Sequence, residues 1–214
     1  MPEEPAVDQR ARPVRISSRA LGAAKSLYVY LPPEYAAEPR RRFPTLYLLR
    51  GHEREWVNPR EDESRGGRTA IDVYEGLRAA GAIGPLILVM PGLASDDNAV
   101  PGMLTDFRSP ELAAAAAGVG SGRFQRYFFD ELIPHIDRSF RTAPAARAVA
   151  GFSLGGYMAV KAAALRPELF ASVGAFDGSF PYGADGGTAA RPGDGLFAPP
   201  MLDAPLGRPR DPGR

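Results

Sequence analysis

A serine flanked by glycines carries the strongest chemical signal in this sequence. Residues 151–155 read Gly-Phe-Ser-Leu-Gly, between an apolar run and an alanine-rich segment. A serine on a sharp strand-to-helix turn exposes its hydroxyl at the carboxyl edge of a sheet, and the glycines leave room for neighbouring backbone. The helix that follows presents free N–H groups and the positive end of its dipole to a developing negative charge. The pattern therefore predicts Ser153 as a nucleophile in acyl transfer.

Such a serine needs two kinds of helper. A base must take the hydroxyl proton during attack, because a serine hydroxyl is a weak nucleophile at neutral pH. Backbone N–H groups must stabilise the oxyanion, and the N–H of Leu154, the next residue, is the expected first donor. The second donor is expected from the loop at residues 50–52. The usual base, a histidine after the serine, is absent, since the only histidines are His52 and His135.

The elements expected around Ser153 are those of an α/β protein. Alternating or continuous apolar runs predict strands, and helical spacing predicts helices. The four-residue spacing of apolar residues over 124–140 forms one helical stripe, which Pro134 should kink or break. Strands that alternate with helices predict a mostly parallel sheet with helices on both faces. Strands are expected at residues 14–17, 27–31, 45–49, 86–90, 146–152 and 170–176, and helices near 69–81, 124–140 and 153–165.

Length and composition limit the possible functions. A chain of 214 residues suits one domain, and its net charge of +1 gives no indication of a nucleic-acid or membrane partner. The absence of cysteine excludes disulfides and thiolate catalysis. No apolar run is long enough to span a bilayer, and the first residues lead into no signal-peptide core. We therefore expect a cytoplasmic protein that acts on a small molecule.

With these motifs in place, the sequence resembles the putative esterase family of α/β-hydrolases, which includes feruloyl esterases, enterochelin esterase-like proteins and mycolyltransferases. The matching pieces run in family order from about residue 14 to about residue 180. They are residues 29–35 (VYLPPEY), 43–49 (FPTLYLL), 131–137 (ELIPHID) and 148–157 (AVAGFSLGGY). The resemblance implies an α/β-hydrolase fold, Ser153 as nucleophile, and the N–H groups of Leu154 and His52 as the oxyanion hole.

The sequence departs from the family pattern in two places. Arg50 precedes the glycine at which many relatives carry histidine or another residue. Family members also supply an acid and then a histidine after later strands, whereas the last 34 residues here hold seven prolines and seven glycines without an apolar period. We expect a flexible lead-in at residues 1–12, an incomplete hydrolase domain at 13–180, and a loop-like or disordered tail at 181–214. The C-terminal strands are expected to be missing.

Other candidate residues have simpler interpretations. His52 is expected to contribute backbone rather than a base, since a residue lining the oxyanion hole is badly placed to reach the serine proton. His135 is expected in the core or on the surface, remote from Ser153. Asp177 follows a predicted strand, where some hydrolases place the acid of the triad, but Asp-Gly is also an ordinary turn. Trp56 either lines a substrate pocket or covers the core.

No metal or cofactor is expected. Asp96, Asp97 and Asp106 match no familiar ligand spacing, and the glycines at 118–122 follow no strand. The leading hypothesis is a serine carboxylic ester hydrolase that works through an acyl-enzyme on Ser153. This chain is expected to be weak or inactive because it lacks a catalytic histidine. The alternatives are an acyltransferase and a hydrolase-like protein that binds a ligand without turnover.

Overall fold

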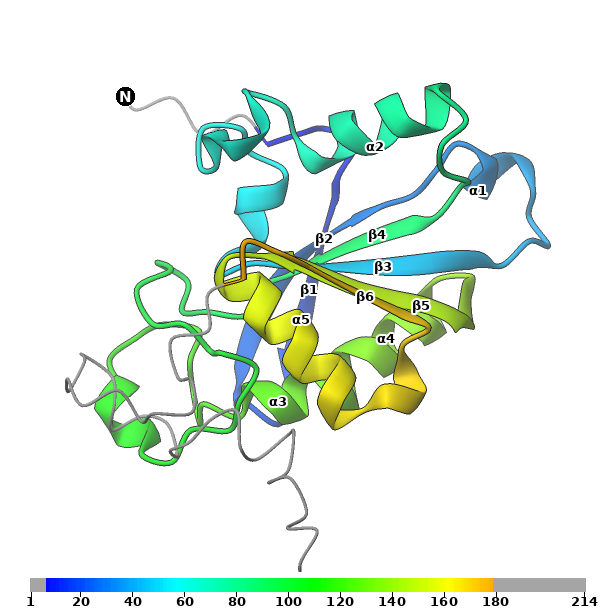
Figure 1. The fold of residues 1–214 in the computed structure, drawn as a ribbon. Helices are drawn as coiled ribbons and strands as arrows, with labels where there is room; N and C mark the ends of the chain where they lie inside the picture. The colour runs from blue at the N-terminus through cyan, green and yellow to red at the C-terminus, as the bar shows by residue number, and fades with distance from the viewer. Residues whose placement is uncertain (1–6, 179–214) are drawn as a thin grey trace, which may run out of the picture.

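The computed structural model describes residues 7–178, and their strands form one mixed sheet (Figure 1). The strand order is β1-β2-β4-β3-β5-β6. β1 pairs antiparallel with β2, and β2 antiparallel with β4, whereas β4, β3, β5 and β6 run parallel. The carboxyl ends of these four strands therefore share one edge of the sheet. The strands are β1 (Arg12–Ser18), β2 (Ala23–Tyr30), β3 (Phe43–Leu49), β4 (Ile87–Pro91), β5 (Thr142–Phe152) and β6 (Ser172–Phe176).

Helices cover both faces of the sheet, which confirms the predicted α/β architecture. α2 (Ala70–Ala79) lies on one face, and α4 (Ile133–Ser139) and α5 (Leu154–Leu165) lie on the other (Figure 1). α2 begins at a capping box in which the Thr69 and Asp72 side chains bond each other's backbone N–H groups. The shorter helices are α1 (Glu34–Ala37), α3 (Phe124–Arg126) and the 3₁₀ turns at Glu53–Trp56, Glu63–Arg65, Pro110–Ala113 and Pro167–Leu169.

The core is divided by the sheet into two apolar layers. Because side chains of a strand alternate between faces, Tyr47 and Leu49 of β3 pack on the α5 side, and Leu46 and Leu48 on the α2 side. β4 is buried along its whole length, as its continuous apolar sequence predicts. Trp56 is buried in the layer beneath α2, where it lines a cavity of about 390 Å³ that is separate from the surroundings of Ser153.

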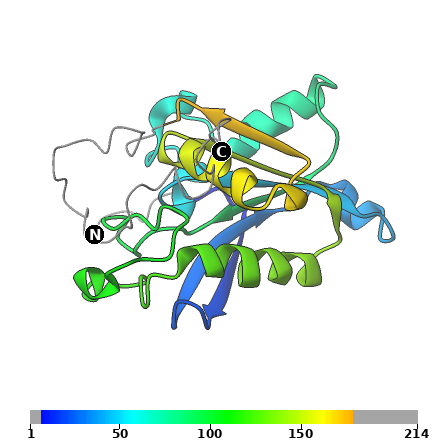
Figure 2. The same cartoon turned by 60° about the horizontal axis from the view of Figure 1, so that its bottom comes forward.

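The apolar stripe over residues 124–140 forms a helical segment, but not a uniform α-helix. Between α3 and α4, residues Tyr127–Leu132 adopt the wider π-helical form. The regular α-helix resumes at Ile133, and the next residue, Pro134, has no N–H to donate back into the preceding π-helical turn. The expected disturbance at Pro134 is thus a change of helix type just before it. Figure 2 shows this green segment crossing the blue strands at an angle.

Several boundaries differ from those predicted. β5 begins at Thr142 rather than 146, because its first residues still pair with Phe43 of β3. The strand predicted at 170–176 begins at Ser172, after the 3₁₀ turn that ends at Leu169. Of the expected flexible lead-in, the part from Val7 onward is described, and there Asp8 accepts a hydrogen bond from Thr69 before α2. The tail expected at 181–214 lies outside the described residues.

Candidate active site

Ser153 occupies the sharp turn between β5 and α5. Its backbone has φ 53° and ψ −119°, a conformation that costs energy for any residue except glycine. The Ser153 N–H donates a hydrogen bond to the carbonyl oxygen of Phe176, at 3.0 Å, which ties the turn to the end of β6. The Ser153 carbonyl accepts from the N–H of Gly156 at 2.9 Å. The strained turn expected from the Gly-x-Ser-x-Gly pattern is therefore present, and neighbouring backbone holds it in place.

The flanking glycines are required by close backbone approach. A Cβ atom on Gly151 would overlap the carbonyl of Gly155, and one on Gly155 would overlap the carbonyl of Leu49 at the end of β3. The start of α5 therefore packs directly on β3 and β5. Leu154 is the first residue of α5, so its N–H has no acceptor within the helix and is available to a ligand beside Ser153.

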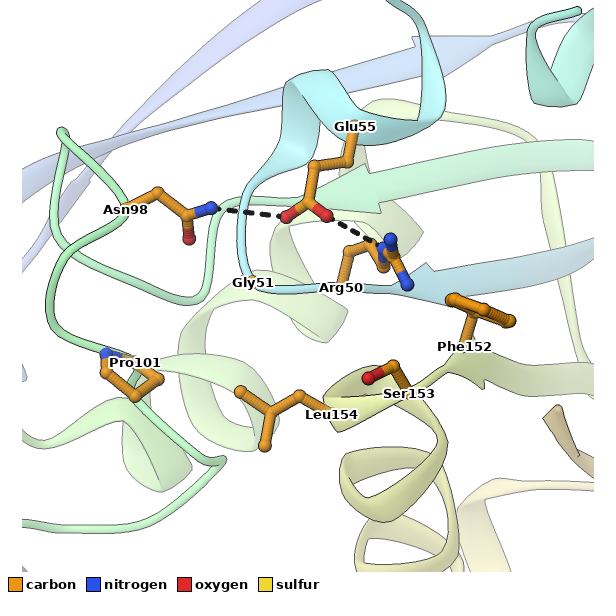
Figure 3. A pocket seen from close by; sticks show the side chains of 8 residues that line it. All are labelled: Arg50, Gly51, Glu55, Asn98, Pro101, Phe152, Ser153 and Leu154. Carbon is orange, nitrogen blue, oxygen red and sulfur yellow. Dashed lines mark hydrogen bonds and ion pairs between the residues drawn. The ribbon is translucent and has the colours of Figure 1, made fainter. Parts of the chain in front are cut away.

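A pocket of about 280 Å³ opens over Ser153 (Figure 3). It is enclosed by three segments that are distant in sequence: the end of β3 with the loop after it, the loop at residues 98–101, and the turn at Ser153. The predicted residues Ser153 and Leu154 both line it. The other lining residues are Arg50, Gly51, Glu55, Asn98, Pro101 and Phe152.

A carboxylate and a guanidinium form one wall of this pocket. Glu55 Oε2 accepts a hydrogen bond from Arg50 Nε at 2.8 Å, and Glu55 Oε1 accepts one from the backbone N–H of His52 at 2.7 Å. The side-chain amide of Asn98 lies 3.4 Å from the same Oε1 (Figure 3). Both charged side chains are largely buried, with 13% of Arg50 and 14% of Glu55 exposed. Ser153 thus shares its pocket with a paired ionic group.

Arg50 is fixed independently of Glu55. Its Nη2 lies 2.9 Å from Asp62 Oδ2, and its guanidinium stacks 4.4 Å from the centre of the Phe152 ring. Arg65 pairs with the same Asp62 at 2.8 Å. Burial acts to raise the pKa of Asp62, but hydrogen bonds from Ser64 and the two arginine charges outweigh it, so this pKa lies below its ordinary value. Asp62 is therefore a stable anionic anchor for Arg50.

The imidazole of His52 does not face Ser153. It is buried, its Nε2 lies 3.2 Å from the carbonyl oxygen of Asp96, and its Nδ1 accepts a hydrogen bond from the Arg54 N–H at 3.3 Å. This pattern fits a neutral ring with its proton on Nε2. Glu53 Oε2 lies 3.4 Å from Nδ1, and burial raises the pKa of this glutamate. The backbone N–H of His52, predicted as the second oxyanion donor, is bonded to Glu55.

The remaining predicted residues lie apart from the pocket. His135, in α4, lines a separate cleft with residues of β1 and has Ser139 Oγ at 3.4 Å from its Nε2. Burial and the charge of Arg138 lower the pKa of His135. Asp177 follows β6 at the same sheet edge as Ser153, with φ 46° and an exposed side chain. Within residues 7–178 no hydrogen bond or ion pair involves its carboxylate.

The acidic residues considered as metal ligands are each engaged elsewhere. Asp96 pairs with the buried Lys25 at 3.1 Å, and Asp106 with Arg126 at 3.1 Å. Asp97 accepts a hydrogen bond from Ser95 Oγ at 2.5 Å. In the described part of the chain, no three His, Asp or Glu side chains gather in a way that would hold a metal ion. None of its helices combines the length and apolar character needed to cross a membrane.

The sequence interpretation missed Glu55 and Asn98 as pocket residues. Glu55 has a usable signal, because it stands three residues after His52, the spacing at which an N3 glutamate reaches back to the N-cap N–H. Asn98 has none, since it reaches the pocket only through the path of the loop between Ala94 and Pro101, which meet in an isolated β-bridge.

Comparison with known proteins agrees with this geometry. The model of the family described as putative esterase matches residues 18–197. An endo-1,4-beta-xylanase/feruloyl esterase from Xylanibacter ruminicola is 30% identical over 166 residues, which cover 75% of this chain and 20% of that protein. An esterase from Mycobacterium tuberculosis is 30% identical over 177 residues, covering 80% of this chain and 33% of that protein. The chain thus spans a third or less of the length of these relatives.

Solved structures share the fold at lower sequence identity. A ferulic acid esterase superposes with a TM-score of 0.62 at 23% identity, covering 81% of this chain and 61% of the other. An S-formylglutathione hydrolase from Agrobacterium tumefaciens superposes with a TM-score of 0.56 at 22% identity, covering 78% of this chain and 57% of the other. These likenesses show that this chain has the α/β-hydrolase fold. The family model, the order of the strands and the strained serine turn agree, and the chain belongs to the putative esterase family.

Proposed function

We propose that the protein is a carboxylic ester hydrolase in which Ser153 is the nucleophile. The observation that carries this proposal is the strained turn of Ser153 at the floor of a pocket, directly before the free N–H of Leu154. In the reaction, Ser153 Oγ bonds to the ester carbonyl carbon as its proton leaves, and the alcohol departs with a proton. Water then breaks the acyl–Oγ bond and releases the acid.

The substrate is expected to be a small-molecule ester. Relatives named feruloyl esterase or ferulic acid esterase make feruloyl esters the first aromatic substrates to test beside short p-nitrophenyl esters. Phe152 and Pro101 give the pocket apolar surface for an acyl or alcohol group. Transfer of the acyl group to an alcohol instead of water would use the same intermediate.

Turnover by this 214-residue chain is expected to be weak. No histidine lines the pocket within residues 7–178, and both ring nitrogens of His52 are occupied. Members of a catalytic triad act as a unit, so loss of the base alone costs about as much as loss of several members, several orders of magnitude in rate. The same observation favours a second candidate, a hydrolase-like protein that binds esters without hydrolysing them.

Labelling with a fluorophosphonate distinguishes these functions, because the probe modifies a serine that attacks its phosphorus. The purified chain and Ser153→Ala would be incubated with the probe and followed by intact mass, together with burst kinetics on p-nitrophenyl acetate. Slow labelling at Ser153, absent from the alanine variant, would support the proposed hydrolase. Saturable binding of a feruloyl ester without modification of Ser153 would support the binding protein and overturn the hydrolase proposal.

A further inference from the structure

The carboxylate of Glu55 occupies a position that the proposed reaction needs. Glu55 Oε1 accepts from the His52 N–H at 2.7 Å, and this N–H is the donor expected to act with that of Leu154 on the oxyanion. A backbone N–H makes one strong hydrogen bond, so the carboxylate and a substrate oxygen compete for it. The bond is charge-assisted, which makes it stronger than one between neutral groups.

The Glu55 side of this contact lies in the wall of the Ser153 pocket, and the buried His52 N–H lies directly behind the carboxylate. Glu55, Asn98 and Ser153 all line the same cavity, which comes from segments brought together only by the fold. A Cβ on Gly51 would meet Asn98 Oδ1 at 2.7 Å and Glu55 Oε1 at 3.2 Å, so both side chains crowd the backbone that carries the donor (Figure 3). A ligand oxygen that approaches the His52 N–H must therefore displace the Glu55 carboxylate.

The groups around Glu55 would remain in place after such a displacement. Arg50 is held by Asp62 at 2.9 Å and by its stacking on Phe152. The ring of His52 is held by the Asp96 carbonyl and the Arg54 N–H. The Glu55 carboxylate, in contrast, is held by the side chains of Arg50 and Asn98 and by the His52 N–H that a ligand oxygen would take over.

We propose that Glu55 is an autoinhibitory gate residue, whose carboxylate blocks the His52 N–H until a substrate carbonyl oxygen displaces it. This proposal rests on the proposed function of Ser153. It assigns Glu55 no proton transfer and no bond to the substrate. Glu55 controls access to one oxyanion donor, and a donor of this kind is worth roughly 10²–10³ in rate where it has been removed from a protease.

Two variants and one matched control test the gate. Glu55→Ala removes the competing carboxylate, and Glu55→Gln keeps an oxygen that accepts from the His52 N–H but removes the charge. We expect fluorophosphonate labelling of Ser153 to be at least about tenfold faster in Glu55→Ala, equivalent to about 1.4 kcal/mol, with Glu55→Gln between it and the wild type. The control is Glu61→Ala, which removes a carboxylate paired with Arg54 at 2.8 Å in the same loop but outside the pocket. Its labelling rate should equal that of the wild type.

A second readout does not depend on Ser153 chemistry. In a Ser153→Ala background, the ¹H–¹⁵N resonance of His52 would be followed while acetate is added. With Glu55→Ala, acetate should shift this resonance saturably, and with Glu55 present it should not. If neither the wild type nor any variant is labelled at Ser153, but acetate shifts the His52 resonance only in Glu55→Ala, the proposed hydrolase function fails. The proposal that Glu55 blocks the His52 N–H is then still supported. If Glu55→Ala is folded but is labelled no faster than the wild type, and acetate does not shift its His52 resonance, the gate proposal is overturned. Glu55 then serves only to cap the 3₁₀ turn that follows His52.

Discussion

The backbone N–H of Ser153 donates a hydrogen bond to the carbonyl oxygen of Phe176, so the turn at Ser153 depends on the last residue of β6. This bond at 3.0 Å joins the turn to β6, in addition to the ladder between β5 and β6. The strained φ of Ser153 persists because β3, β5, β6 and the glycines of α5 each fix part of it. Substitutions at these contacts should therefore change both the free energy of unfolding and the reactivity of Ser153.

Gly155→Ala should destabilise the protein, because its Cβ would overlap the carbonyl oxygen of Leu49. We expect the free energy of unfolding to fall by about 1–3 kcal/mol, as for other overpacked sites. Gly76→Ala is the matched control, since nothing lies within 4 Å of a Cβ there and the residue is inside α2. In this control, the free energy of unfolding should rise by about 0.5–1 kcal/mol, because alanine is favoured over glycine inside a helix. Denaturant unfolding of both variants checks this, and an equal loss in the two would contradict the close approach.

His52→Ala tests whether the imidazole is structural or catalytic. The ring is buried and bonded at both nitrogens, so we expect a loss of about 1–3 kcal/mol in stability. At a temperature where the variant is folded, Ser153 labelling should fall less than about tenfold. Loss of a true base would instead lower it by orders of magnitude. His135→Ala, which changes a histidine in a separate cleft, is the control. A fall of a thousandfold confined to His52→Ala would identify the ring as the base.

Asp177→Asn should have little effect on the stability of the protein or on the labelling rate of Ser153. The side chain is exposed, and asparagine tolerates the left-handed conformation of φ 46° as aspartate does. We expect a change of less than about 0.5 kcal/mol in stability and an unchanged labelling rate of Ser153. Thermal unfolding and probe kinetics measure the two. A loss of labelling without loss of stability would instead support Asp177 as the acid of the site.

Lys161→Met should remove a pH dependence of stability. Lys161 is buried in α5, and burial lowers its pKa from 10.5 to about 8, although Asp106 opposes the shift. The unfolded chain therefore binds more protons than the native chain between these values, and stability rises with pH from about 8 to about 10. The rise should be at most about 3 kcal/mol. Urea titrations at pH 7, 8, 9 and 10 should show a steeper increase for the wild type than for Lys161→Met, and parallel curves would refute the assignment.

Local patterns in the sequence predict the parts of this molecule that local physics determines. The apolar run of β4, the capped helix α2 and the turn at Ser153 each carry their signal within a few residues. β5 begins earlier than predicted because residues 142–145 lack a strand pattern, whereas Thr142 pairs with Phe43 ahead of a register shift. Tertiary pairing overrides propensity there.

The pocket wall could be predicted only in part. The three-residue spacing of His52 and Glu55, which is typical of a capping box, is visible in the sequence. Whether Glu55 then covers the predicted oxyanion donor depends on the path of the loop, which the spacing does not predict. The approach of Asn98 to Glu55 joins residues 43 apart in the sequence, and the stacking of Arg50 on Phe152 joins residues 102 apart. No local pattern in the sequence predicts these contacts, because they depend on the order of the strands in the folded sheet.

The π-helical turn at Tyr127–Leu132 sets the rotational phase of the helix that follows it. In a regular α-helix, side chains spaced four apart drift by about 40° per step around the axis, so a stripe of four-residue spacing soon leaves the core. A π turn advances less per residue and cancels that drift. Phe124, Phe128, Leu132 and Ile136 are accordingly all fully buried. The π-helical turn thus has the effect of one extra residue inserted into an α-helix. The side of α4 that faces β1 depends on this extra residue.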